Sequence, residues 1–187
     1  MRSIRPALVA VGLAALLALG GCGQTKPTAA KTDSGSSSPA DTSYPTQTRK
    51  ACDVLTAEIA KSLLGSVAAA APPVPVADSD AVLVTTCVRA NAVTGLDKTR
   101  SLSLLMRVAK SKVGATANES VFSSASLPTG AQNVSGYGDH AFWNPAYGQL
   151  NILKNGNWYI LSSGLIDPRK HTLPDAEKLA DKIIDKL

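Results

Sequence analysis

Three cysteines and two histidines are the residues that most restrict the chemistry open to this 187-residue chain. His140 directly follows Asp139, and adjacent side chains on a strand point to opposite faces, so the pair makes a poor catalytic dyad. His171 stands beside Arg169 and Lys170 and is predicted to lie on the surface before the last helix. The sequence contains no nucleophile elbow, zinc-protease motif, P-loop or calcium loop. It therefore predicts no catalytic residue, no metal site and no cofactor.

Residues 1–21 have the three parts of an export signal. Arg2 and Arg5 supply a positive start, and an apolar run over residues 7–19 is followed by small residues before Cys22. A bilayer core of about 30 Å needs roughly 20 apolar residues, so the run is too short to favour a transmembrane anchor. We therefore expect residues 1–21 to be a cleaved signal peptide.

The sequence Leu19-Gly20-Gly21-Cys22 resembles the bacterial lipobox. That resemblance implies that diacylglycerol is attached to the Cys22 sulfur and that the peptidase cuts directly before this residue. Two or three acyl chains would hold the protein stably on the extracytoplasmic face of the cell membrane. The alternative is an ordinary secreted protein with a chance cysteine near its cleavage site.

Residues 22–50 are predicted to form a disordered tether. The segment is rich in Ser, Thr, Ala, Pro and Gly and has no hydrophobic period, so it cannot bury enough apolar surface to fold. The formal charge of +5 does not describe the C-terminal part of the chain, because residues 51–187 hold 13 Lys or Arg against 12 Asp or Glu. A nearly neutral domain gives no argument for binding nucleic acid.

Cys52 and Cys87 remain as a pair once Cys22 is assigned to lipid. In an exported protein such a pair predicts one disulfide. A metal site or a reactive thiol is the alternative, but neither cysteine belongs to a CxxC motif and no histidine lies near them in the sequence.

Residues 51–187 are predicted to form a single α+β domain. Periodicity favours strands over residues 82–90, 101–108, 141–144, 149–154 and 157–163, and helices over residues 53–64, 115–125 and 173–187. Residues 66–80 are predicted to be a loop, and Asn155-Gly156 a two-residue hairpin turn. We expect a twisted antiparallel sheet flanked by the N- and C-terminal helices, with one disulfide joining the first helix to the first long strand.

Side-chain spacing predicts which faces are buried. Thr56 is expected to cap the first helix and Gly65 to end it, while Val121 and Phe122 point inward from the middle helix. The remaining residues expected in the core are Leu102, Leu104, Met106, Val108, Leu150, Ile152, Tyr159, Leu161, Ala176, Leu179, Ala180, Ile183 and Leu187.

Several short motifs of this domain resemble a large group of bacterial lipoproteins that is especially common in actinobacteria. They are Cys52-Asp53-Val54-Leu55-Thr56, Leu63-Leu64-Gly65, Cys87, Gly136-Tyr137-Gly138-Asp139 and a tryptophan-bearing strand. The sequence departs from the group after Cys87, where Val88-Arg89 stand in place of a frequent aromatic residue. The resemblance implies a sensor-like envelope lipoprotein with an antiparallel sheet and helices, and it transfers no catalytic residue.

Six of the eight aromatic residues fall between Tyr137 and Tyr159. Most are expected to fill the core, whereas Trp143 and Tyr147, on either side of Asn144-Pro145, are predicted to reach solvent and contact a partner. The hypothesis is a non-enzymatic, lipid-anchored module that binds an envelope protein or a small ligand. The alternatives are a hydrolase acting on the cell wall and a purely structural envelope component or folding-assisting accessory.

Overall fold

The computed structural model describes residues 49–67, 75–93, 95, 97–127 and 130–187. The predicted signal peptide (1–21), Cys22 and the tether up to residue 48 lie outside these residues. The helices and strands follow one another as α1 (Ala51–Val54), α2 (Ala57–Leu64), β1 (Pro75–Asp78), β2 (Val82–Ala90), β3 (Arg100–Ala109), α3 (Lys112–Ala125), β4 (Gln132–Asn133), β5 (His140–Asn144), β6 (Gln149–Lys154), β7 (Asn157–Leu165), the 3₁₀ turn η1 (Pro168–Lys170), α4 (Leu173–Ile183) and the 3₁₀ turn η2 (Ile184–Lys186).

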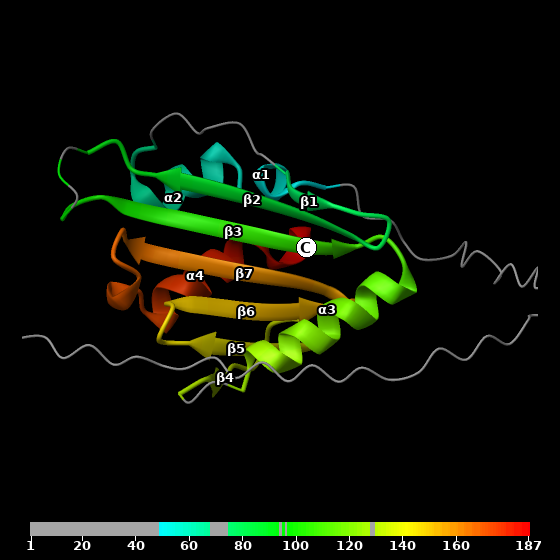
Figure 1. Cartoon of the computed structure of the whole chain (residues 1–187). Helices are drawn as coiled ribbons and strands as arrows, with labels where there is room; N and C mark the ends of the chain where they lie inside the picture. The colour runs from blue at the N-terminus through cyan, green and yellow to red at the C-terminus, as the bar shows by residue number, and fades with distance from the viewer. Residues whose placement is uncertain (1–48, 68–74, 94, 96, 128–129) are drawn as a thin grey trace, which may run out of the picture. The chain divides into compact units, whose positions relative to one another are not determined.

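The seven strands of the described residues belong to one antiparallel sheet, in the order β1-β2-β3-β7-β6-β5-β4 (Figure 1). The long strands β2, β3 and β7 form its centre, and β4 forms the short edge beside β5. The predicted turn between β6 and β7 is confirmed, because Asn155 and Gly156 have φ angles of 52° and 70°. Positive φ at both central residues is what a type I′ turn requires.

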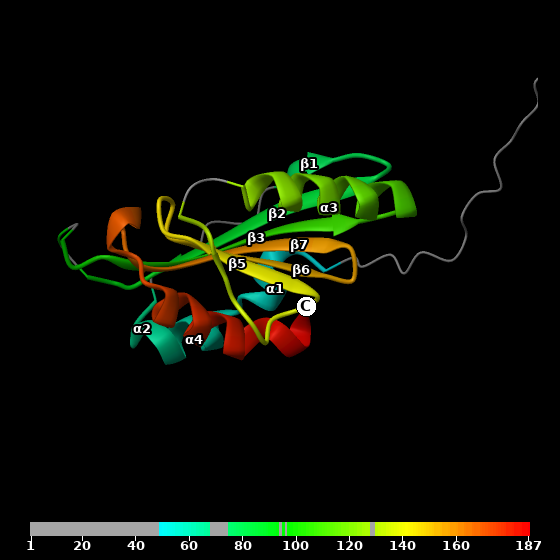
Figure 2. The same ribbon diagram turned by 90° about the horizontal axis from the view of Figure 1, so that it is seen from below.

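Helices cover both faces of the sheet. Figure 2 shows α1, α2 and α4 on one face and α3 alone on the other. The α+β class and the antiparallel sheet flanked by N- and C-terminal helices are therefore confirmed. The two terminal helical segments pack on the same side, whereas the middle helix has the opposite face to itself.

The main core lies between the sheet and the face covered by α1, α2 and α4. Alternation along β3 directs Leu102, Leu104, Met106 and Val108 into it, as predicted, and each is fully buried. The other strand and helix residues predicted to fill this core are also buried: Leu150, Ile152, Tyr159, Leu161, Ala176, Leu179, Ala180, Ile183 and Leu187.

Cys52 and Cys87 form the predicted disulfide, with their Cα atoms 5.0 Å apart. The bond joins α1 to β2, and the backbone N–H of Ala51 donates to Oγ1 of buried Thr85 on the same strand, at 3.0 Å. Closing a loop of this length stabilises a fold by about 3–4 kcal/mol in the chain-entropy model. The start of the domain is thus held against the sheet by a covalent bond and a buried hydrogen bond.

Three expectations about local structure are wrong. The single first helix is divided at Leu55–Thr56, because Leu55 leaves helical geometry and Thr56 begins a new helix by accepting from the Ile59 N–H. The predicted loop 66–80 contains β1, which pairs with β2. Val121 is 42% exposed on the outer side of α3, although Phe122 is buried as expected.

Candidate functional site

Helix α3 is held on the sheet by residues at its start. Ser111 caps it by accepting from the Gly114 N–H at 3.2 Å. Gly114 lies so close to the turn between β1 and β2 that a Cβ atom there would be 1.9 Å from the carbonyl oxygen of Ala81. Only glycine allows this approach, and it fixes where the helix crosses the strands.

Asn118 anchors the middle of α3 and is fully buried. Its Nδ2 donates to the carbonyls of Arg107 and Gly156, at 2.9 and 3.0 Å, and its Oδ1 accepts from Arg107 Nε at 3.2 Å. The side chain therefore joins α3 to β3 and to the β6–β7 turn. Leaving buried polar groups of this kind unpaired costs free energy, so these hydrogen bonds favour one position of α3 on the sheet.

An aromatic cluster lies beneath the C-terminal half of α3. Phe122 packs edge to face against Phe142 and Trp158, with ring centroids 5.0 and 6.4 Å apart, and Leu153 completes the cluster. The guanidinium of Arg107 lies over the Trp158 ring at 5.7 Å. Residues of this cluster line two hollows of the surface, and Phe142 contributes to both.

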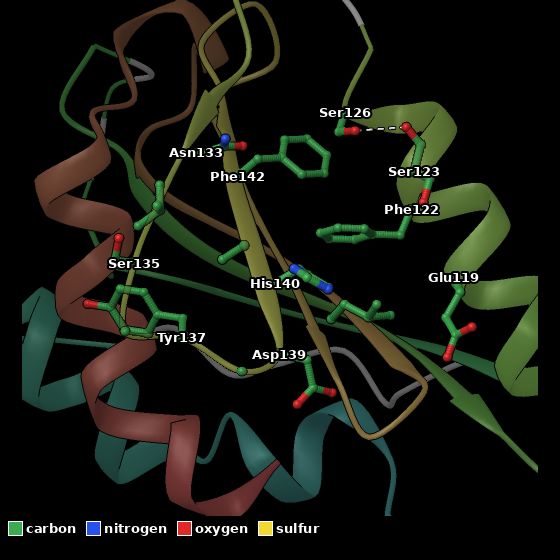
Figure 3. A pocket seen from close by; sticks show the side chains of 15 residues that line it. Glu119, Phe122, Ser123, Ser126, Asn133, Ser135, Tyr137, Asp139, His140 and Phe142 are labelled. Atoms are coloured by element: carbon green, nitrogen blue, oxygen red, sulfur yellow. Dashed lines mark hydrogen bonds between the residues drawn. The ribbon is translucent and has the colours of Figure 1, made fainter.

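The larger hollow, called the α3 groove here, lies between α3 and the segment that leads from β4 into β5 (Figure 3). It has a volume of about 770 Å³. Glu119, Phe122, Ser123 and Ser126 line it from the helix. The opposite wall and the floor consist of Asn133, Val134, Ser135, Gly136, Tyr137, Gly138, Asp139, His140, Ala141, Phe142 and Leu153.

The glycine-rich segment before β5 shapes the far wall of the groove. Gly138 has φ 60°, and a Cβ atom there would be 2.4 Å from the carbonyl oxygen of Leu153. Asp139 comes next, with its N–H donating to that carbonyl at 2.7 Å and its Oδ2 accepting from the Asn155 N–H at 2.7 Å. Gly138 and Asp139 thus hold the segment against the β6–β7 hairpin. The Asp139 carboxylate has a structural role, because it accepts a hydrogen bond from that hairpin.

Tyr137 joins the same segment to α4. Its hydroxyl donates to Oδ1 of Asp181 at 2.9 Å. Burial, followed by the hydrogen bond and the charge of Asp181, raises the pKa of Tyr137 to about 12. This tyrosine holds its proton at neutral pH and serves as a link between the groove wall and the helix on the opposite face.

The groove brings His140, Asp139 and Glu119 to one hollow, and all three residues are exposed. In the part of the chain that the structure describes, no hydrogen bond joins His140 to a carboxylate or a hydroxyl. No group of three or more His, Cys, Asp or Glu residues in that part is placed to hold a metal ion. The exposed polar side chains of the groove are accessible to a ligand.

His171 lies deeper than the sequence suggests. Its Nδ1 is 3.1 Å from the carbonyl oxygen of Gly148, and its Nε2 is 2.6 Å from that of Leu165. The ring packs against Gly164, where a Cβ atom would be 2.7 Å from the His171 ring. The side chain is half-buried and joins the β5–β6 loop to the end of β7, which makes it a structural residue.

The prediction that Trp143 reaches solvent is wrong. Alternation along β5 points Ala141 and Trp143 to the face covered by α4, so Trp143 is 5% exposed and belongs to the main core. Its neighbours Phe142 and Asn144 point to the face that carries α3. Tyr147, in the loop between β5 and β6, is 61% exposed as expected.

Tyr147 lies at the second hollow, called the slot here, which Phe142 also lines. The slot has a volume of about 170 Å³. No motif in the sequence predicts it, because its residues come from α3, β5, the β5–β6 loop, β6 and β7. They are Ala125, Phe142, Asn144, Tyr147, Gln149, Asn151, Trp158 and Ile160.

Comparison with known proteins adds no family to these observations. No protein-family model, curated protein or solved structure matches the chain. Within the described residues, none of the helices has the length and apolar character needed to cross a membrane. Function is therefore inferred from the sequence motifs and from the geometry of the face that carries α3.

Proposed function

We propose that this chain is a lipid-anchored lipoprotein of the bacterial envelope whose extracytoplasmic domain is a non-enzymatic binding module. The export signal and the lipobox-like sequence that ends at Cys22 support the anchor. The disulfide between Cys52 and Cys87 fits an oxidising compartment outside the cytoplasm. The resemblance to envelope lipoproteins points the same way.

One observation carries the binding part of the proposal. Helix α3 covers only part of its sheet face and leaves two hollows, the α3 groove and the slot, which are both lined in part by Phe142. Concave surfaces with an apolar floor and a few polar groups are the usual form of binding sites. The opposite face is filled by α1, α2 and α4 and forms the core.

The hydrolase alternative has less support. His140 lies in the α3 groove, but Glu119 and Asp139 are exposed and Asp139 is already hydrogen-bonded to the hairpin. A general base acts through a hydrogen-bonded partner and an orienting group, and the described residues do not join His140 to either. The groove residues are therefore assigned to ligand contact.

Site-specific photocrosslinking in intact cells tests which face binds. A photoreactive residue is placed at Ser123, in the wall of the α3 groove, or at Tyr147, at the rim of the slot. Matched controls carry it at Lys178 or Lys182, which are exposed on α4. We expect adducts from Ser123 and Tyr147 and none from the two α4 positions. Adducts from α4 alone, or none from any position, would contradict the proposal.

A further inference from the structure

His171 packs against the loop that carries Tyr147. Gly148 follows Tyr147 in that loop, has φ 60°, and lies so close to His171 that a Cβ atom there would be 2.5 Å from the His171 Cβ. Gly164, near the end of β7, lies against the imidazole ring, where a Cβ atom would be 2.7 Å from Cδ2. Because only glycine allows the approach on each side, the ring has a defined position between the loop and β7.

Both ring nitrogens of His171 face carbonyl oxygens. Nδ1 is 3.1 Å from the carbonyl oxygen of Gly148, and Nε2 is 2.6 Å from that of Leu165. A carbonyl oxygen only accepts and a neutral imidazole has one N–H, so both contacts are hydrogen bonds only when both nitrogens carry protons. The shorter contact, to Leu165, keeps its proton when the ring is neutral. The lone pair of Nδ1 then faces the Gly148 oxygen, and the hydrogen bond to the loop is lost.

The charged groups on the elements packed around His171 pair with one another. They belong to η1 and its N-cap, to the start of α4 and to β3, and they are Asp167, Arg169, Lys170, Asp175 and Arg100. Asp167 pairs with Arg169 at 3.0 Å, and Asp175 with Arg100 at 3.9 Å, while Lys170 is exposed. Among the described residues, no ion pair joins any of them to the imidazole, and the loop adds only Tyr147 as a titratable group. The hydrogen bond to Gly148 therefore depends on the protons of the ring itself.

We propose that protonation of His171 sets the position of Tyr147 at the rim of the slot, an inference that rests on the binding module proposed above. When both ring nitrogens carry protons, Nδ1 donates to the Gly148 carbonyl and holds the loop against β7. When Nδ1 loses its proton, its lone pair repels that oxygen and Gly148 moves away from the ring. Tyr147, the preceding residue, is 61% exposed and moves with it. His171 is thus a positioning residue that acts on a partner through Tyr147.

The proposed location outside the cytoplasm exposes this contact to changes of pH. Histidine is the side chain that ordinarily changes charge between about pH 5 and 8. Binding through Tyr147 should therefore weaken as the pH rises through that range. The other end of the loop keeps its own anchor, because Oδ1 of Asn144 accepts from the Ala146 N–H at 3.1 Å. The α3 groove should not respond, since His171 does not line it.

NMR titration of the full-length mature protein in detergent micelles tests the contact without a partner. The probes are the carbonyl carbon of Gly148 and the ring nitrogens of the two histidines, with His140, exposed in the α3 groove, as the internal control. We expect the Gly148 signal to follow the titration of His171, and to keep this dependence in His140→Ala. His171→Asn keeps an N–H donor near the place of Nδ1 and does not titrate, so its Gly148 signal should be independent of pH.

Photocrosslinking in cells tests the effect on binding. With the photoreactive residue at Tyr147, we expect about two- to tenfold more adduct at about pH 5.5 than at about pH 8, the range that corresponds to one hydrogen bond. With the photoreactive residue at Ser123, in the α3 groove, the yield should be the same at both pH values. His171→Asn should remove the pH dependence at position 147.

Three outcomes would overturn the inference. They are a Gly148 signal that does not follow His171, a Gly148 signal that still depends on pH in His171→Asn, and a yield of adducts from Tyr147 that is equal at both pH values. If Tyr147 gives no adduct at any pH, the proposed binding face fails there instead. The Gly148 titration needs no partner, so it distinguishes that failure from a failure of the His171 contact.

Discussion

At the scale of residues, hydrogen-bonded polar side chains fix the positions of α3 and of the segment opposite it. Asn118 seats α3, and Asp139 and Tyr137 hold the segment opposite it. Asn118 is hard to recognise in the sequence, because a polar residue interrupts the apolar spacing of Ala115, Phe122 and Ala125. That interruption also explains why the sequence placed Val121 inward, where the structure has it outside.

Replacing Asn118 with Ala should destabilise the domain by about 2–3 kcal/mol, because the carbonyls of Arg107 and Gly156 and the Arg107 guanidinium lose their buried partner. Urea unfolding followed by circular dichroism measures the free energy. Glu119→Ala, the exposed neighbour on the same helix, is the control and should change it by less than about 0.5 kcal/mol. Equal effects of the two substitutions would show that the hydrogen bonds of Asn118 do not seat the helix.

Tyr137 should make stability depend on alkaline pH. Its pKa is raised to about 12 in the folded protein, against about 10 in the unfolded chain, so its contribution is complete below pH 10 and is lost between pH 10 and 12. The difference in unfolding free energy between the unmodified protein and Tyr137→Phe should therefore shrink across that window. Comparison with Tyr137→Phe removes the titration of lysines, which both proteins share. A difference that is constant from pH 9 to 12 would refute the assignment.

At the scale of elements, the sequence predicted those strands and turns whose positions are set by side-chain alternation and by turn residues. The strands β2 and β6 were predicted with the bounds that the structure has, and Asn155-Gly156 set the register of β6 with β7. The edge strand β4 was missed because its two residues, Gln132 and Asn133, are exposed and carry no alternation. Such a strand exists only because β5 offers it a partner.

The error at Trp143 could have been avoided from the sequence. The loop between β5 and β6 has four residues, Pro145 to Gly148, which sets Asn144 opposite Gln149 and Trp143 opposite Leu150. Since Leu150 was predicted to face the core, Trp143 must face it too. The hollows beside α3 could not have been found in this way, because they depend on where a helix distant in sequence crosses the strands.

Gly114→Ala tests whether the close approach of Gly114 to the Ala81 carbonyl fixes the position at which α3 crosses the strands. The added Cβ would overlap the Ala81 carbonyl, so the start of α3 must shift, at a cost of about 1–3 kcal/mol. Helix propensity alone predicts the opposite sign, since alanine favours a helix interior over glycine by about 1 kcal/mol. Thermal unfolding compares it with Thr116→Ala, an exposed position on the same helix. A Gly114→Ala protein that is more stable than the unmodified protein would contradict the claim that this approach fixes the position of α3.

At the scale of the whole molecule, we propose that a sheet with one filled face and one hollowed face is tethered to an anchor at Cys22. The helices and strands of the described residues lie within residues 51–187, a part of the sequence that carries almost no net charge. The anchor and the tether rest on the sequence alone, because they lie outside the described residues. If Cys22 carries the lipid, Cys52 and Cys87 remain as a pair, and the disulfide between them agrees with that proposal.

The mass of the mature N-terminus, measured in cells supplied with a labelled fatty acid, is the decisive test of the anchor. We predict that the mature protein begins at Cys22 and carries diacylglycerol and the label. Cys22→Ala should carry none, whereas the Cys52→Ala, Cys87→Ala double variant should still be labelled. A mature protein that begins elsewhere, or an unlabelled Cys22, would contradict the lipid-anchored binding module.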